Sequence, residues 1–153
     1  MFRLYSKGCE YALRALTYAA RQNEDARFRA SDVCKQTGVP ESSSRKIIQA
    51  LVQGGFLRAV RGPDGGYVLS RNPDRITLLD VIRAVDWNDM FDRCVLRLPV
   101  CGTKQPCPLH ETRLSAKQRL IEQLERKTLQ ELAEAAHHDR SMRRAGRPYT
   151  VTQ

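Results

Sequence analysis

The chain has 153 residues, of which 26 are Lys or Arg and 17 are Asp or Glu, so its formal net charge is +9 at pH 7. Hydrophobic residues make up 41% of it, which suits one domain with a packed core and excludes a wholly disordered or fibrous protein. No run approaches the roughly 18 apolar residues that span a bilayer, and the start lacks the apolar segment of a signal peptide. The excess positive charge favours a polyanionic partner, which by charge alone is a nucleic acid or an acidic membrane surface.

The first half of the chain predicts three helices. Apolar residues recur at helical spacing over 6–22, where Ser6 is placed to cap the N-terminus. A second helix is expected over 31–37, with Gly38 in the stop position, and a third over 41–53 before a Gly-Gly pair. Because only a Gly-Val-Pro tripeptide separates the second and third helices, they predict a tight helix–turn–helix.

A β-hairpin is expected next, around the Gly-Pro-Asp-Gly-Gly turn of residues 62–66. Such a turn permits positive φ and a sharp reversal between two short β-prone runs. A helix–turn–helix followed at once by a hairpin is the order of a winged helix. Arg58 and Arg61 beside the turn, and Asp64 and Gly65 within it, are therefore expected to lie at the backbone or minor groove of a nucleic acid.

The helix over 41–53 has a polar and basic outer face that suits the major groove of DNA. Its candidate DNA-binding side chains are Ser42, Ser43, Arg45, Lys46 and Gln49. An arginine reads guanine bidentately, a glutamine reads adenine, and serines more often hold phosphates. The alternative is the solvated face of an ordinary amphipathic helix, but the adjoining hairpin and the net charge favour DNA.

The second half begins with a fourth helix over 78–85, which completes a winged-helix domain expected over residues 1–85. Thr77 and Asp80 form a variant of the capping box at its start. Residues 86–107 then form a long irregular segment that contains three cysteines. A loop of about twenty residues is uncommon in a compact chain and is usually functional.

Two further helices are expected over 108–136. The first begins at Pro108, continues to about residue 127 and carries one narrow apolar stripe on a charged surface, which fits the same helix of a second subunit. The second is a short closing helix over 129–136, with a capping box of Thr128 and Glu131 at its start. The basic tail, 137–153, is expected to be disordered.

The cysteine segment predicts a metal site. Cys94, Cys101 and Cys107 have the spacing C-x6-C-x5-C, and an odd total of five cysteines without an export signal disfavours a disulfide framework. His110 follows Cys107 by one helical turn, so its imidazole is a candidate fourth ligand of an iron–sulfur cluster. A Cys3His zinc site is the rival, although structural zinc loops usually space paired ligands by two to four residues. Three unligated thiols are the third interpretation.

Together these features resemble the bacterial Rrf-type family of winged-helix transcription regulators, which includes IscR, NsrR and CymR. The motifs that carry the resemblance are YALRAL at 11–16, VRGPDGGY at 60–67, ITLLDVI at 76–82 and TLQEL at 128–132. The expected fold is mainly α with a small β-hairpin wing, as a winged helix-turn-helix plus a long C-terminal dimerisation helix. The resemblance implies a homodimer that binds a double-stranded DNA operator in the bacterial cytoplasm, not a membrane. No nucleotide fingerprint or Ser/His/Asp arrangement accompanies the cysteines, so an enzyme is not expected.

The resemblance also implies a cofactor. In cluster-bearing members, an iron–sulfur cluster on the three cysteines reports on iron, nitric oxide or redox state. In members resembling IscR, a histidine at the position of His110 completes a 2Fe–2S cluster, which is the first expectation here. In members resembling NsrR, a carboxylate of the other subunit, at the position of Glu10, completes a 4Fe–4S cluster. The first cysteine gap is six residues where five is usual in both branches, and a cluster-free regulator controlled by a partner protein or a zinc-stabilised regulator is the alternative.

Overall fold

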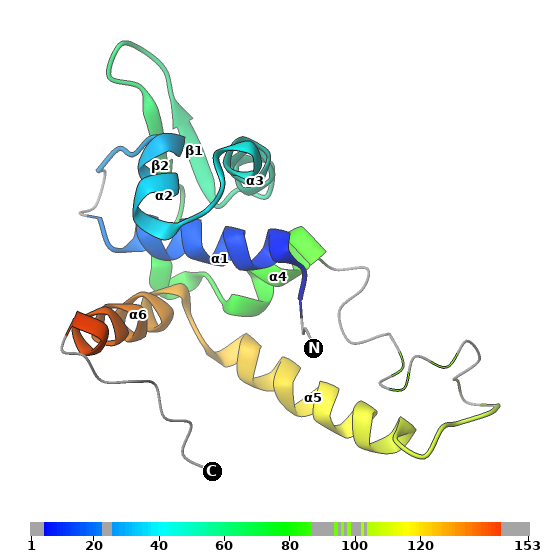
Figure 1. The fold of residues 1–153 in the computed structure, drawn as a ribbon. Helices are drawn as coiled ribbons and strands as arrows, with labels where there is room; N and C mark the ends of the chain where they lie inside the picture. The colour runs from blue at the N-terminus through cyan, green and yellow to red at the C-terminus, as the bar shows by residue number, and fades with distance from the viewer. Residues whose placement is uncertain are drawn as a thin grey trace.

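The computed structural model describes residues 5–22, 26–86, 94, 96, 98, 102 and 104–144, with side chains as far as residue 136. In these residues it contains six helices, a two-stranded antiparallel hairpin and a short 3-10 turn (Figure 1). The elements are α1 (Lys7–Ala20), α2 (Ala30–Thr37), α3 (Glu41–Gln53), β1 (Leu57–Val60), β2 (Gly66–Leu69), η1 (Pro73–Arg75), α4 (Leu78–Asp86), α5 (His110–Arg126) and α6 (Leu129–Arg144). This is the predicted mainly α fold with a small hairpin wing.

The first three helices pack around one core, as the apolar spacing predicts. The side chain of Ser6 caps α1 by accepting a hydrogen bond from the backbone N–H of Cys9 at 3.1 Å. Gly38 ends α2 in the left-handed region, with φ of 70°, which glycine adopts without steric cost. The buried core residues that these helices supply are Ala12, Ala15, Leu16, Ala19, Val33, Ile47, Ile48 and Leu51.

The hairpin is held by more than its own two strands. Leu57 pairs with Leu69 and Val60 with Gly66 in the antiparallel register. Phe28, just before α2, adds an isolated bridge to Tyr67, with N···O distances of 3.0 and 2.8 Å. The wing is therefore tied to the segment that enters the helix–turn–helix.

The starts of α4 and α6 lie side by side because their capping residues pair. Both predicted capping boxes are present: Thr77 and Asp80 exchange bonds of 3.1 Å, and Thr128 donates its N–H to Glu131 at 2.8 Å. Thr77 and Thr128 also form an isolated β-bridge. This junction connects the last two helices back to the core, where Leu129 is buried.

Two helix boundaries differ from the prediction. Pro108 is not helical: it lies in a turn, with the His110 N–H donating to the Cys107 carbonyl at 2.9 Å, and α5 begins at His110. The closing helix does not stop at residue 136 but continues to Arg144. The expectation of a disordered tail is therefore wrong for 137–144, and its remainder, 145–153, lies outside the described residues.

The long helix α5 contacts mainly α4 and extends away from the other helices (Figure 1). Its only buried side chain is that of His110, and Leu114 is 40% exposed. Near its C-terminal end, Leu124 packs against buried Cys9 and Ile82. Within the described ranges, no helix has the length and hydropathy that a membrane span requires.

Candidate nucleic-acid interface and candidate cluster site

The helix–turn–helix presents the predicted face of α3 to solvent. Pro40 precedes the first turn, and its carbonyl accepts the N–H groups of Ser43 and Ser44 at 3.0 Å each. Ser44, which was not singled out from the sequence, is buried and donates its hydroxyl to the Glu41 carbonyl at 2.9 Å. The exposed candidate side chains are Ser42, Arg45, Lys46 and Gln49, and Ser43 is half-buried. In the described part of the chain, neither basic side chain among them has an ion-pair partner, so both are available to an anion.

The wing carries the other predicted basic contacts. Arg58 and Arg61 are exposed, as is Asp64 at the turn. Gly65 is explained by the turn itself, because a Cβ there would lie 2.6 Å from the Val60 carbonyl oxygen. Gly65 thus permits the reversal that presents the arginines, and any contact between its backbone and DNA stays a prediction.

One basic residue of this surface was missed from the sequence. Arg27 is exposed, and its Nη1 donates to the backbone carbonyl of Asp64 at the wing turn, at 3.2 Å. From the sequence, the polar residues 23–27 indicate only a turn, so Arg27 is not among the predicted DNA contacts. The alternation of Arg27, Phe28 and Arg29 was the available signal, because it is the pattern of a short half-buried β-segment.

The α3 face and the wing belong to one end of the molecule. Figure 1 shows α3 beside the hairpin, with α5 on the other side of α1 and α4. A duplex at the first end and a second subunit on α5 would therefore not compete for the same surface.

The cysteine segment brings two of its predicted ligands together. The Sγ atoms of Cys94 and Cys107 lie 3.8 Å apart, and neither residue is in a disulfide. Two thiolates bound at about 2.3 Å to one tetrahedral metal ion lie about 3.8 Å apart, so the pair fits metal coordination. Cys101, the third predicted thiol, lies outside the described residues.

Among the residues that the structure describes, neither candidate fourth ligand forms a metal-binding group with Cys94 and Cys107. His110 is 6% exposed and opens α5 one turn after Cys107. Glu10 is half-buried on α1 and forms ion pairs with Lys7 Nζ at 2.6 Å and Arg14 Nη2 at 2.7 Å. Across the described ranges, no three His, Cys, Asp or Glu side chains form a group that could hold a metal ion. Both residues therefore stay predictions as ligands.

The cysteine of α1 has a different environment. Cys9 is fully buried, and burial, followed by the negative charge of Asp86, raises the pKa of its thiol to about 12. Asp86 also accepts the Ser6 N–H at the start of α1. A thiol held protonated in a core is a packing group rather than a metal ligand.

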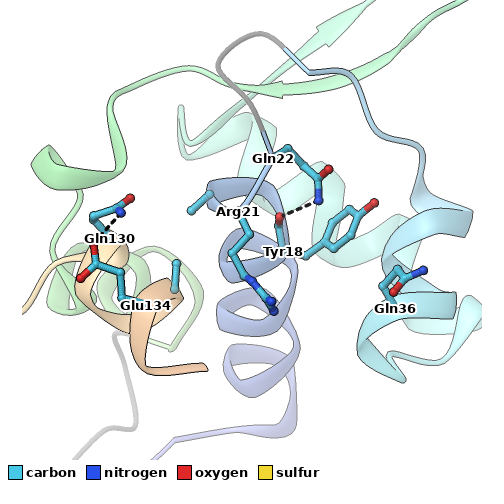
Figure 2. Close-up of a pocket in the computed structure, with 8 residues that line it drawn as sticks. Tyr18, Arg21, Gln22, Gln36, Gln130 and Glu134 are labelled. Carbon is cyan, nitrogen blue, oxygen red and sulfur yellow. Dashed lines mark hydrogen bonds between the residues drawn. The ribbon is translucent and has the colours of Figure 1, made fainter. Parts of the chain in front are cut away.

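A surface hollow of about 530 Å³ lies between α1, α2 and α6 (Figure 2). Two of its polar side chains bond nearby groups: Gln22 donates to the Tyr18 carbonyl at 3.3 Å, and Gln130 donates to Glu134 at 2.8 Å. The hollow shares no lining residue with α3, the wing or the cysteine segment. It is a polar depression apart from both candidate sites.

Comparisons with known proteins agree on the kind of protein. The Rrf2 family, described as "Iron-dependent Transcriptional regulator", matches residues 5–135. The chain is 32% identical to the HTH-type transcriptional regulator IscR of Pectobacterium atrosepticum over 130 residues, which cover 85% of this chain and 78% of that protein. It is 30% identical to a putative HTH-type transcriptional regulator of Aquifex aeolicus over 109 residues, 70% and 75% of the two chains. The solved structure of CymR, the global cysteine regulator of B. subtilis, has a TM-score of 0.70 at 23% identity and covers 88% of this chain and 98% of that one. The family and these relatives are transcription regulators and not enzymes.

Proposed function

The chain belongs to the Rrf2 family of bacterial winged-helix transcription regulators, and on that premise we propose that it is a homodimer whose binding to operator DNA depends on an iron–sulfur cluster. The observation that carries the proposal is the distance of 3.8 Å between the Sγ atoms of Cys94 and Cys107, just before the start of α5. As a regulator of transcription it would act in the bacterial cytoplasm.

The α3 face and the wing are the proposed DNA-binding surface. Exposed Arg45 and Gln49 lie on the α3 face. The second helix of a helix–turn–helix is the one that enters the major groove, and α3 holds that position here. Arg58 and Arg61 lie on the wing, where they would meet phosphates or the minor groove. Each phosphate contact releases counterions, so the affinity of this surface for DNA should fall steeply with salt.

The apolar stripe of α5 is the proposed dimer interface. Leu114 is exposed, and Leu120, Ile121 and Leu124 are only half-buried. Covering such a stripe with a partner stabilises the complex by about 25 cal/mol for each Å² of apolar surface removed from water. A second copy of α5 offers the same stripe, which is the self-complementary arrangement of a two-fold dimer.

The cluster is proposed to bind Cys94, Cys101 and Cys107. When bound, it would supply one-electron chemistry and would react with nitric oxide or oxidants. Its occupancy would follow the iron supply. His110 is the proposed fourth ligand of a 2Fe–2S form, because it is already one turn from Cys107 on the first turn of α5. Glu10 of a second subunit is the alternative for a 4Fe–4S form. In either form the chain holds the thiolate of Cys107 just before the start of α5.

The site can affect DNA binding through α5. The Cys107 carbonyl accepts the His110 N–H at 2.9 Å, so a change at the thiols acts directly on the start of this helix. At the other end of α5, Leu124 contacts Ile82 of α4. The Nη2 atom of Arg83 on α4 also lies 3.7 Å from Oε1 of Glu125 on α5. A shift of α5 would alter the separation and tilt of two α3 helices in a dimer, and hence their fit to two half-sites.

Anaerobic purification of the full chain tests the cofactor. We expect a coloured protein with iron and acid-labile sulfide in equal amounts, and loss of both in Cys107→Ser but not in Cys34→Ser. Zinc without iron would replace the proposal with a structural site. A colourless, metal-free protein would replace it with a cluster-free regulator controlled by a partner protein.

Mössbauer spectra of iron-57 protein test the fourth ligand and the cluster type. His110→Ala should change or abolish the 2Fe–2S spectrum, whereas Glu10→Ala should leave it intact. Glu111→Ala, an exposed neighbour on the same turn, is the matched control. A spectrum that survives His110→Ala and is lost in Glu10→Ala would assign the carboxylate instead.

A further inference from the structure

Cys94 and Cys107 are two thiols in direct contact although they are 13 positions apart in the sequence. Their Sγ atoms, 3.8 Å apart, are within hydrogen-bonding range for sulfur. A disulfide needs the sulfurs at about 2.05 Å, and rotation of a cysteine side chain about its Cα–Cβ bond changes the position of its sulfur by more than this difference. The geometry is therefore one small movement from a covalent bond.

Both thiols can be reached from solvent. Cys94 and Cys107 are half-buried, whereas Cys9 is completely enclosed in the core. Cys34 is also half-buried, but among the four cysteines that the structure describes only Cys94 and Cys107 touch each other. Of the described cysteines, these two therefore offer a small oxidant a thiol that is not enclosed in the core and has a second thiol beside it.

The backbone around the pair can follow such a movement. The described residues on this stretch, which are Cys94, Leu96, Leu98, Gly102 and 104–109, lie in no helix or strand. Backbone without a hydrogen-bonded ladder shifts at lower cost than a packed element. Closing the sulfur–sulfur gap would not require α5 to unwind.

We propose that Cys94 and Cys107 are a modification site, at which a low-molecular-weight disulfide oxidises the metal-free protein to an intramolecular disulfide. The thiolate of one cysteine attacks a sulfur of the oxidant, which forms a mixed disulfide and releases one small thiol. The second cysteine thiolate attacks the mixed disulfide, forms the Cys94–Cys107 bond and releases the second small thiol. Two S–H bonds are lost from the protein, and the oxidant takes both electrons and both protons as two thiols.

The disulfide removes two of the three thiolates that the proposed function assigns to the cluster. Only this consequence rests on the proposed function, because the bond itself needs no cluster. The oxidised chain and the cluster-loaded chain exclude each other. The same segment therefore reports thiol oxidation separately from iron supply.

The test uses the full chain, stripped of metal by a chelator, reduced, and then incubated without oxygen in oxidised glutathione. The three cysteines of the segment fall on three tryptic peptides, residues 94–97, 98–104 and 105–113, so a linked pair is identified by mass. We expect maleimide, added after the chain is unfolded in denaturant so that Cys9 is also accessible, to label three thiols of the five instead of all five. Mass analysis should find a cross-linked pair of the first and third peptides. Dithiothreitol should restore all five.

Variants distinguish the Cys94–Cys107 bond from a disulfide to another cysteine and from separate glutathione adducts. Cys101→Ser and Cys34→Ser should still form the link, whereas Cys94→Ser and Cys107→Ser should lose it and leave a glutathione adduct on the remaining cysteine. Five labelled thiols, separate adducts on both residues of the wild type, or a link to Cys101 would overturn the inference.

Metal uptake distinguishes this inference from the proposed function. The oxidised chain should take up no ferrous iron and sulfide until it is reduced. A reduced chain that forms the disulfide but never binds iron would remove the proposed cluster and leave the disulfide. A chain that binds iron and never forms the disulfide would remove the disulfide alone.

Discussion

Two regions of the molecule differ in how far they bury their apolar side chains. The compact region, made of α1 to α4, the hairpin and α6, buries its large side chains within one chain, including Leu16, Leu51 and Leu129. The arm, made of Cys94, Cys107 and α5, buries only one residue of its helix, His110, and leaves Leu114 exposed. The compact region therefore buries its own apolar surface, whereas the arm leaves apolar surface exposed for the proposed second subunit.

The cysteines show the same contrast. Cys9 in the compact region is enclosed and has a raised pKa, and Cys94 and Cys107 of the arm are half-buried and in contact. The environment, rather than the residue type, separates a packing thiol from a reactive or ligating one.

The largest expected effect is on the stability of the compact region. Leu51→Ala should lower the free energy of unfolding by about 2–5 kcal/mol, because it opens a cavity among fully buried side chains. Urea denaturation measures the change. Leu114→Ala, in protein dilute enough to be monomeric, should change it by less than about 0.5 kcal/mol. Equal losses in the two variants would break the contrast between the regions.

The second effect is on association through the arm. Ile121→Glu should raise the dimer dissociation constant at least about 100-fold, since a two-fold interface would bury the unpaired carboxylate twice. Sedimentation velocity over a concentration series measures it. The neighbouring Glu122→Gln should leave association almost unchanged. A dimer that survives Ile121→Glu would place the interface elsewhere.

The third effect is on DNA binding by the compact region. Arg45→Ala should weaken binding to a duplex selected from a random library by about 1–3 kcal/mol, or roughly 5- to 150-fold, and relax preference at one base pair. Arg119→Ala, which removes the same charge from exposed α5, is the control. Fluorescence anisotropy at fixed salt distinguishes them. Equal weakening in both variants would mean that total charge, and not the α3 face, governs affinity.

The smallest effect sharpens the contrast between the cysteines. The pKa of Cys9 is raised in the folded state, from an ordinary value of 9.0 to about 12, so the unfolded chain releases its proton first as pH rises. The stability that this group contributes is full below pH 9 and is lost between pH 9 and about 12, at roughly 1.4 kcal/mol per pH unit. Urea midpoints at pH 8 and 10 should therefore fall further in wild type than in Cys9→Ala. Parallel falls would show that another group is responsible.

Local signals predicted most of the compact region. The two capping boxes, at Thr77 and Thr128, are each complete within four residues of sequence, and the glycine turn of the wing is complete within five. The bridge from Phe28 to Tyr67 was not predicted, because an isolated bridge depends on a partner far away in the chain. Arg27 was missed although its alternation with Phe28 and Arg29 was a local signal, because three residues are too short a run to indicate a strand.

The boundaries of the C-terminal helices were the least predictable. The composition of 137–144 resembles a disordered tail, yet α6 continues through it because the chain has no glycine or proline between its capping box and Gly146. Extending a nucleated helix costs little, whereas starting one costs much. At α5 the turn that includes Pro108 displaced the helix start by two residues, to His110.

The cysteine spacing predicted a shared site, and the structure confirms the proximity of two of its members. The spacing alone does not predict which two sulfurs are in contact, because gaps of six and five residues allow many loop conformations. The ligand roles of Cys101, His110 and Glu10 stay predictions.

The most direct test of the account is the affinity of the protein for one selected duplex, measured without oxygen at fixed salt before and after treatment with a chelator that removes the proposed cluster. The account predicts at least a tenfold difference in the dissociation constant, reversed when iron and sulfide are restored. Equal affinity of the loaded and metal-free protein would contradict it.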